Sequence, residues 1–227
     1  MLIALLLALQ TEPKFEDKTI EYKGGTVKYQ VCVPAGYDAA KPMPLIVFLH
    51  GSGEQGDDGA KQSSVGIGPA IRKNPQGWAP FVVLLPQKPR ARGGFMEYED
   101  LILGQIEKTK KEYKIDEARI YLTGLSMGGM GSWLLAGKHP QLWAAVAPVC
   151  GAGNPADAPK IKDLPIWNFH GDKDNAVPIK RSEEMIEAVK AAGGKPKFTI
   201  YPGVGHNSWD KAYQEEKLWE WFLQHKR

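Results

Sequence analysis

The sequence has few cysteines and no long apolar run, and these absences exclude several classes of protein. Cys32 and Cys150 are the only cysteines among 227 residues, too few for a disulfide framework. Each lies in an apolar, strand-like segment, so we expect two buried free thiols, although an oxidising compartment would permit their pairing. The longest apolar run, residues 1–10, is too short to span a bilayer, so no stable membrane association is expected.

Motifs for binding metals, phosphates and nucleic acids are also missing. The histidines lack His-Glu-x-x-His spacing and the cysteines lack Cys-x-x-Cys spacing, so no metal is expected. The Gly-Lys-Ser/Thr motif that cradles phosphates does not occur either. The net charge is only +3, and no run of Lys and Arg is interleaved with aromatic residues. We therefore expect neither a cofactor nor a nucleic-acid partner.

What the sequence does contain suits one soluble globular domain. Its composition is 43% hydrophobic and 24% charged, and its length fits a single core, which we expect over residues 16–227. Residues 1–10 resemble the apolar region of a secretory signal peptide, although no basic residues precede them and Ala8-Leu9-Gln10 is a weak cleavage site. We predict a secreted or periplasmic protein with residues 1–10 as a signal-peptide remnant. The alternatives are an apolar N-terminus without that role and a signal whose true start lies upstream.

Short apolar segments alternate with helical segments along most of the chain. The apolar segments are continuous, as in strands buried on both faces of a parallel sheet: 45–49, 81–85, 120–122, 144–149, 166–169 and 198–201. Helices are expected at 98–113, 127–138, 179–192 and 209–224, with a short one near 66–72. Earlier, residues 19–22 and 26–33 flank Gly24-Gly25 and predict an antiparallel hairpin. The alternation indicates an α/β fold with a mostly parallel sheet and helices on both faces.

The strongest functional motif lies between the predicted strand 120–122 and the predicted helix 127–138. Gly124, Ser126 and Gly128 form Gly-x-Ser-x-Gly, which in this strand–turn–helix context exposes a nucleophilic serine. The glycines let strand and helix approach closely, while the turn holds Ser126 in strained backbone geometry. The backbone N–H of Met127, at the helix N-terminus, is expected to face the oxyanion of the reaction. A purely structural serine in a Gly-rich helix entry is the alternative.

A serine nucleophile needs a general base and a carboxylate that orients the base. In this type of site the chain order is serine, acid, histidine. His206 follows the last predicted strand, which places it at the same sheet edge as Ser126. Asp172 and Asp174 compete as the acid; we favour Asp174, which lies farther into its loop, and expect Asp172 to brace the turn. The other histidines after Ser126 are expected to be structural or in the tail: His139, His170 and His225.

A second backbone donor to the oxyanion should come from the Gly-rich loop after the first central strand. We predict the N–H of Ser52 as the partner of the Met127 N–H, with Gly53 as the alternative. Glycine lets the backbone approach a substrate oxygen closely. His50 is expected to brace this loop through hydrogen bonds without transferring protons.

Together these segments resemble the α/β-hydrolase superfamily, and more narrowly serine esterases that are phospholipase/carboxylesterase-like or polyhydroxybutyrate-depolymerase/feruloyl-esterase-like. The resemblance covers nearly all of the chain after about Val31 and rests on these segments: 50–54, 124–129, 170–178 and 206–209. It implies a Ser126, Asp174 and His206 triad, with donors at Ser52 and Met127. Related proteins often have Arg where this chain has Gln55, so the resemblance does not carry over polar support from that position.

The link between the predicted strands 144–149 and 166–169 is too short for a lid domain, which indicates an open site. Gly53, Phe95 and Trp209 are the predicted substrate contacts. Phe95 and Met96 either line the substrate pocket or only pack within their own loop. Trp209 stacks on substrate or, as we favour, anchors the last helix in the core.

These features predict an acyl-enzyme serine ester hydrolase. Its expected partner is an ester substrate, either a feruloyl or acetyl ester of a plant polysaccharide or a small short-chain ester. The alternatives are a peptidase of the prolyl-oligopeptidase type and a hydrolase-fold binding module without activity.

Overall fold

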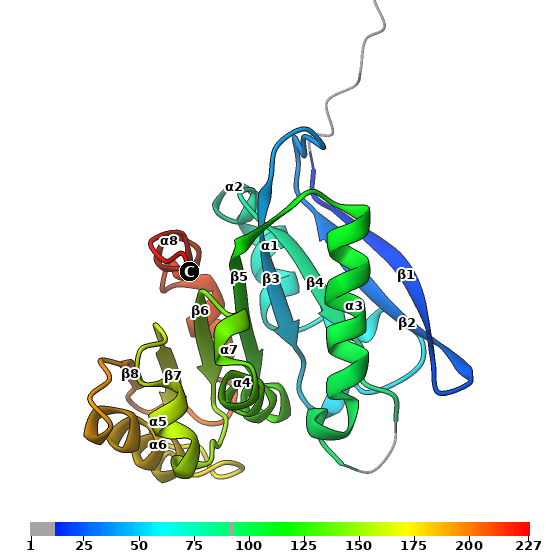
Figure 1. The fold of residues 1–227 in the computed structure, drawn as a ribbon. Coiled ribbons are helices and arrows are strands. Elements are labelled where there is room, and N and C mark those ends of the chain that lie inside the picture. The colour runs from blue at the N-terminus through cyan, green and yellow to red at the C-terminus, as the bar shows by residue number, and fades with distance from the viewer. Residues whose placement is uncertain (1–11, 91–92) are drawn as a thin grey trace, which may run out of the picture.

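A twisted eight-stranded sheet forms the centre of the computed structural model, which describes residues 12–90 and 93–227 (Figure 1). Residues 1–10, predicted to be a signal-peptide remnant, lie outside the described residues. The strands, in chain order, are β1 Lys14–Tyr22, β2 Gly25–Val33, β3 Met43–Leu49, β4 Val82–Pro86, β5 Ile115–Leu125, β6 Ala145–Val149, β7 Trp167–Gly171 and β8 Lys197–Tyr201.

The sheet is antiparallel at its N-terminal edge and parallel elsewhere, as the sequence predicts. Its spatial order is β1-β2-β4-β3-β5-β6-β7-β8. Strands β1 and β2 form the predicted hairpin, and β2 also pairs antiparallel with β4. From β4 onward in this spatial order, each strand, β3 included, pairs in parallel with the next. Parallel pairing brings the carboxyl ends of β3, β5, β7 and β8 to one edge, which is where ligands bind in such sheets.

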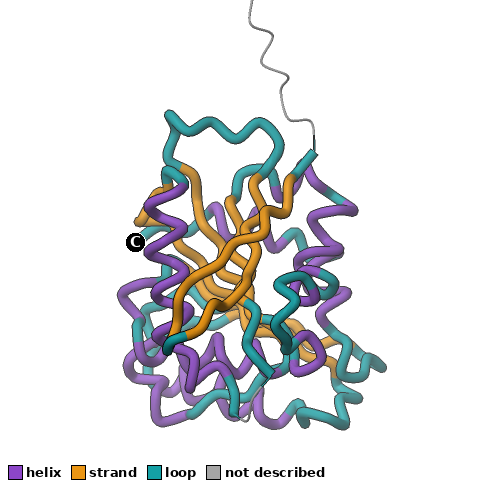
Figure 2. Tube along the Cα trace, turned by 90° about the vertical axis from the view of Figure 1, so that its right-hand side faces the viewer, coloured by secondary structure: helices purple, strands orange, loops and turns teal. Residues whose placement is uncertain are grey.

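Helices cover both faces of the sheet (Figure 2). They are α1 Ile67–Lys73, α2 Pro75–Trp78, α3 Glu99–Glu112, α4 Met127–Lys138, α5 Ala158–Ile161, α6 Lys180–Ala191, α7 Trp209–Gln214 and α8 Leu218–Leu223. Short 3-10 helices are η1 Ser52–Glu54, η2 Lys61–Ser63, η3 Phe95–Tyr98, η4 Pro140–Leu142 and η5 Pro155–Asp157. No helix within the described ranges has the length and apolar character needed to cross a membrane.

The predicted single helix over 209–224 is wrong, because the segment forms two short helices, α7 and α8. Lys217, just before α8, has a φ of 47°, in the left-handed region that a regular right-handed helix does not use. The helical spacing of apolar residues is the same in both short helices, so this pattern does not detect a single left-handed residue between them. The predicted strand 120–122 is also too short, since β5 begins at Ile115.

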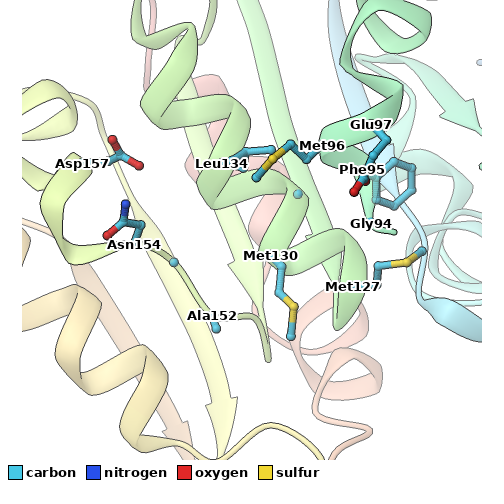
Figure 3. A pocket seen from close by; sticks show the side chains of 12 residues that line it. Gly94, Phe95, Met96, Glu97, Met127, Met130, Leu134, Ala152, Asn154 and Asp157 are labelled. Atoms are coloured by element: carbon cyan, nitrogen blue, oxygen red, sulfur yellow. The ribbon is translucent and has the colours of Figure 1, made fainter. Parts of the chain in front are cut away.

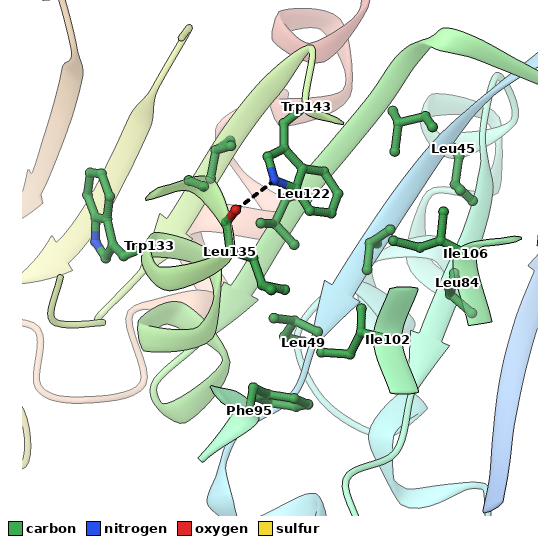
Figure 4. Packing of buried hydrophobic residues seen from close by; sticks show 14 of the residues in the cluster. Leu45, Leu49, Leu84, Phe95, Ile102, Ile106, Leu122, Trp133, Leu135 and Trp143 are labelled. Carbon is green, nitrogen blue, oxygen red and sulfur yellow. Dashed lines mark hydrogen bonds between the residues drawn. The ribbon is translucent and has the colours of Figure 1, made fainter. Parts of the chain in front are cut away.

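Two hydrophobic clusters, one on each face, explain the continuous apolar strands. On the first face, side chains of α3 and α4 such as Ile106 and Leu135 pack on the sheet (Figure 4). In the same cluster the Trp143 indole N–H donates to the Leu135 carbonyl at 3.1 Å. On the second face, α1, α7 and α8 pack on the sheet. Because alternate residues point to opposite faces, Leu122 joins the first cluster and Tyr121 the second.

Candidate active site

The turn between β5 and α4 holds Ser126 in strained geometry, as the sequence predicts. Its φ is 54° and its ψ is −116°, a conformation costly for a residue with a side chain. A Cβ on Gly124 would lie 2.4 Å from the Gly128 carbonyl oxygen, and one on Gly128 would lie 1.9 Å from that of Leu49. Both glycines are therefore required by close backbone packing, and the Ser126 side chain remains partly exposed.

Ser126, His206 and Asp174 lie in one hydrogen-bonded chain, although 80 residues separate the first two. The Ser126 Oγ is 2.9 Å from His206 Nε2, and His206 Nδ1 is 2.7 Å from Asp174 Oδ2. His206 lies in the loop after β8 and Asp174 in the loop after β7. The parallel sheet thus brings together the three residues that the sequence singled out.

The Asp174 carboxylate is buried but well hydrogen-bonded. Its Oδ1 accepts the N–H groups of Ala176 and Val177, each at 2.9 Å. Burial raises the pKa of Asp174, but the hydrogen bonds from His206 and from these two N–H groups outweigh it, so the pKa lies below its usual value. This carboxylate is therefore ionised near neutral pH, the state that orients and stabilises a histidine cation.

Two neighbouring residues have the supporting roles that the sequence predicts. Asp172 is exposed, and its Oδ1 accepts the Gly203 N–H at 2.7 Å, which braces the turn. His170 is fully buried between the Ser182 hydroxyl, 2.7 Å from Nδ1, and the Val177 carbonyl, 2.8 Å from Nε2. Its Nε2 also lies 3.1 Å from Asp174 Oδ2, so His170 orders the acid loop.

The loop after β3 lies against Ser126. A Cβ on Gly51 would be 3.9 Å from Ser126 Cβ. His50 braces this loop as expected: its Nε2 accepts the Lys88 N–H at 2.9 Å, so its Nδ1 donates to the Gly51 carbonyl at 2.5 Å. Burial lowers the pKa of His50 to about 4, which keeps the ring neutral. Ser52 and Gly53 are exposed beyond it, at the start of η1.

Gln55 gives polar support to this loop, a point that the resemblance left open. Its side-chain N–H donates to the Ser52 carbonyl at 3.1 Å, and its Oε1 accepts from the Lys88 ammonium at 2.9 Å. The amide therefore links the residue with the predicted oxyanion donor to the segment after β4. A glutamine both donates and accepts, so it can bridge a carbonyl and an ammonium group.

The predicted substrate contacts differ in their surroundings. Phe95 is 2% exposed and packs edge-on against His50, with ring centroids 5.1 Å apart, although it also borders a cavity. Met96, by contrast, is 54% exposed. Trp209 packs against the second hydrophobic cluster and meets the His206 ring edge-on at 5.4 Å. Trp209 thus has the favoured core role and additionally contacts the histidine.

Sequence reasoning missed that Cys150 lies beside the site. One ligand atom from each of Cys150, Asp174 and His206 falls within 4.8 Å of the others, the one such group in residues 12–90 and 93–227. Burial raises the pKa of the Cys150 thiol to about 12, so the thiol stays protonated at neutral pH. Binding a metal or attacking an ester requires the thiolate instead. Asp174 and His206 are also bonded to each other, so the group suits a metal poorly. The sequence signal that could have placed Cys150 near Ser126 was its position directly after β6, the strand that pairs with β5.

The mostly parallel sheet with its strained serine turn defines a hydrolase of the α/β-hydrolase superfamily, which confirms the superfamily that the sequence predicts. Residues 94–220 match the dienelactone hydrolase family. The chain belongs to this family. The sequence predicted the superfamily but not the dienelactone hydrolase family within it.

Relatives of this chain carry the names of esterases and lactone hydrolases. A protein of Escherichia coli named carboxymethylenebutenolidase is 32% identical over 129 residues, 48% of each chain. A protein of Aspergillus niger named feruloyl esterase C is 25% identical over 82% of this chain and 69% of its own. The crystal structure of a thermostable esterase superposes with a TM-score of 0.85 at 32% identity, over 94% of this chain and 63% of that one. This chain thus spans about half of the Escherichia coli relative.

Proposed function

We propose that this protein is a serine carboxylic ester hydrolase that works through an acyl-enzyme on Ser126. The observation that carries this proposal is the hydrogen-bonded chain from Ser126 Oγ to His206 Nε2 and from His206 Nδ1 to Asp174. The proton of Ser126 passes to His206 as Oγ attacks the ester carbonyl carbon. Ionised Asp174 stabilises the imidazolium that results.

The remaining steps complete the proposed mechanism. The oxyanion forms at the N-terminus of α4, where the Met127 N–H is free of the helix ladder and the helix dipole favours negative charge. We assign the Ser52 N–H as the second donor. His206 then protonates the leaving alcohol. A water molecule, deprotonated by His206, attacks the acyl carbon, and His206 returns this proton to Ser126 Oγ as the acyl–Oγ bond breaks and the acid leaves.

Ser126 is a better nucleophile candidate than Cys150. Ser126 is partly exposed and hydrogen-bonded to the base, whereas Cys150 is fully buried and its thiol is held neutral. Nucleophilic attack needs access to the substrate as well as a base. The buried thiol satisfies neither requirement as well as the serine does.

For the substrate we propose feruloyl or acetyl esters of plant polysaccharides, or small short-chain esters, and for the protein an exported location. The name of the Aspergillus niger relative and its match to most of this chain support the feruloyl assignment. An uncovered serine supports esters carried on soluble polymers.

The test is the initial rate of ester hydrolysis by the protein and by two variants, Ser126→Ala and Cys150→Ala. The substrates are methyl ferulate, para-nitrophenyl acetate and butyrate, and acetylated xylan. Loss of the nucleophile should reduce kcat by roughly 10⁴- to 10⁶-fold. A fluorophosphonate should label the parent protein and Cys150→Ala but not Ser126→Ala. Labelling that survives in Ser126→Ala and disappears in Cys150→Ala would move the nucleophile to Cys150.

A further inference from the structure

A cavity of about 350 Å³ opens on the outer side of α4. Its large apolar lining residues are Phe95, Met96, Met127, Met130 and Leu134, and we call this cavity the methionine groove. Figure 3 shows Met96 beside Leu134, with Asn154 and Asp157 on the opposite side of α4. Met96 and Met130 are 54% and 39% exposed, among the few large apolar side chains left open in the described structure. The volume lies in the range of about 300–1,000 Å³ for small-molecule sites.

The groove adjoins the reaction centre through Met127, the residue that follows Ser126. Met127, the residue that supplies the proposed oxyanion N–H, also contributes its side chain to the lining. A group bound at the Met127 end of the groove therefore lies near the carbonyl carbon that Ser126 attacks. Methionines are flexible and polarisable, so they suit apolar groups of varied shape.

The position of His206 decides which half of the ester the groove receives. His206 must protonate the leaving alcohol, so the alcohol departs on the side of Ser126 where His206 lies. His206 contacts Trp209, which packs against the cluster on the α1, α7 and α8 face. Phe95 and the α4 residues beneath the groove belong to the opposite cluster. The groove therefore lies away from the leaving group, on the acyl side.

The charges around the groove favour an uncharged acyl group. Of the described residues that line it, the charged ones are Glu97 and Asp157, both acidic. Lys160 pairs with Asp157 at 2.7 Å, which reduces this negative charge without reversing it. A carboxylate on the acyl group would be desolvated beside like charge, which costs binding free energy. The name carboxymethylenebutenolidase, carried by the Escherichia coli relative, denotes a substrate with a carboxyl group.

We propose that the methionine groove is the acyl-binding site, and that it selects uncharged apolar acyl groups, aromatic or of medium aliphatic length, over acyl groups bearing a carboxylate. The proposal rests on the proposed esterase function and adds the part of the substrate that this surface recognises.

The test compares para-nitrophenyl hexanoate with the acetate ester and with the mono-para-nitrophenyl ester of adipate. Met130→Trp fills the groove, and its kcat/KM ratio of hexanoate to acetate should fall about tenfold or more, the scale expected for lost apolar contacts. Met130→Lys should raise the ratio of adipate monoester to hexanoate by a similar factor. Ile200→Trp is the matched control, 42% exposed on β8 outside the groove, and should keep the parent ratios.

Ratios that stay at the parent values in both Met130 variants would overturn the groove assignment. Equal hydrolysis of the acetate ester by the parent protein and Ser126→Ala, or none by either, would instead overturn the esterase function. A binding measurement separates the two failures. Cinnamamide, an uncharged amide of an aromatic acid, should bind the parent protein and Ile200→Trp in calorimetry and bind Met130→Trp about tenfold more weakly. Equal binding to all three would contradict the groove without reference to turnover.

Discussion

At the scale of single residues, two aspartates two positions apart have different surroundings. Asp174 is 7% exposed, and its oxygens accept from His206 and from two backbone N–H groups. Asp172 is exposed and accepts from one backbone N–H. The same side chain type therefore holds the candidate base His206 in one place and braces a turn in the other. This difference separates their expected effects on catalysis.

We expect Asp174→Asn to lower kcat for para-nitrophenyl acetate by about 10⁴-fold, the scale seen when a triad carboxylate becomes an amide and the base loses its tautomer. Asp172→Asn is the matched control, because an amide oxygen can still accept the Gly203 N–H. Its rate should stay within about a factor of three, as for surface changes of about 0.5 kcal/mol. Equal losses in the two variants would contradict the assignment of the acid.

At the scale of elements, the entry into α4 depends on backbone contacts that leave no room for side chains. The strained Ser126 turn brings α4 against the end of β3, where a Cβ on Gly128 would meet the Leu49 carbonyl at 1.9 Å. Gly104, within α3, is the opposite case. A Cβ there would make an ordinary contact with the Ile20 side chain at 3.4 Å.

These two helical glycines make a matched pair for a stability measurement. Gly128→Ala should lower the free energy of unfolding by several kcal/mol or prevent folding, because the backbone of β3 cannot move aside. Gly104→Ala should raise it by roughly 0.5–1 kcal/mol, the helix propensity difference between the two residues. Urea unfolding followed by circular dichroism measures both. An unchanged midpoint for Gly128→Ala would show that the close approach is not rigid.

At the scale of the whole molecule, two buried histidines link folding to pH. His50 and His170 are fully buried, and burial lowers the pKa of both, that of His50 from 6.5 to about 4. Between these pKa values the unfolded chain binds more protons than the folded protein. The stability that neutral His50 contributes is therefore complete above about pH 6.5 and is lost as the pH falls toward 4, and the lowered pKa of His170 adds a loss of the same sign.

For His50 the shift corresponds to roughly 3 kcal/mol. We expect the free energy of unfolding, measured by urea titration at a series of pH values, to decrease between pH 6.5 and 4.5. Ionised carboxylates such as Glu16, whose pKa is lowered to about 2 by hydrogen bonds that outweigh its burial, lose their contribution at lower pH. His50→Gln should show a smaller decrease over this interval. A stability that rises as the pH falls would contradict the neutral state of His50.

The sequence by itself determined most of the elements and the choice of candidate site residues, because both depend on local patterns. Continuous apolar segments predicted the parallel strands, and Gly-x-Ser-x-Gly between strand and helix predicted the Ser126 turn. The order of serine, acid and histidine, with strands ending at one sheet edge, predicted the meeting of Ser126, Asp174 and His206. Element bounds were less accurate, as at Lys217, where one left-handed residue divides the last helix.

Only the tertiary structure decided what surrounds that site. The nearness of Cys150, the bridge that Gln55 makes between Ser52 and Lys88, and the methionine groove all join segments from different strands and loops. No local period or spacing encodes such contacts, because they depend on strand order and on how loops pack at the sheet edge. The candidate site residues were therefore predictable from local sequence, whereas the shape and charge of the surface around them depend on long-range packing.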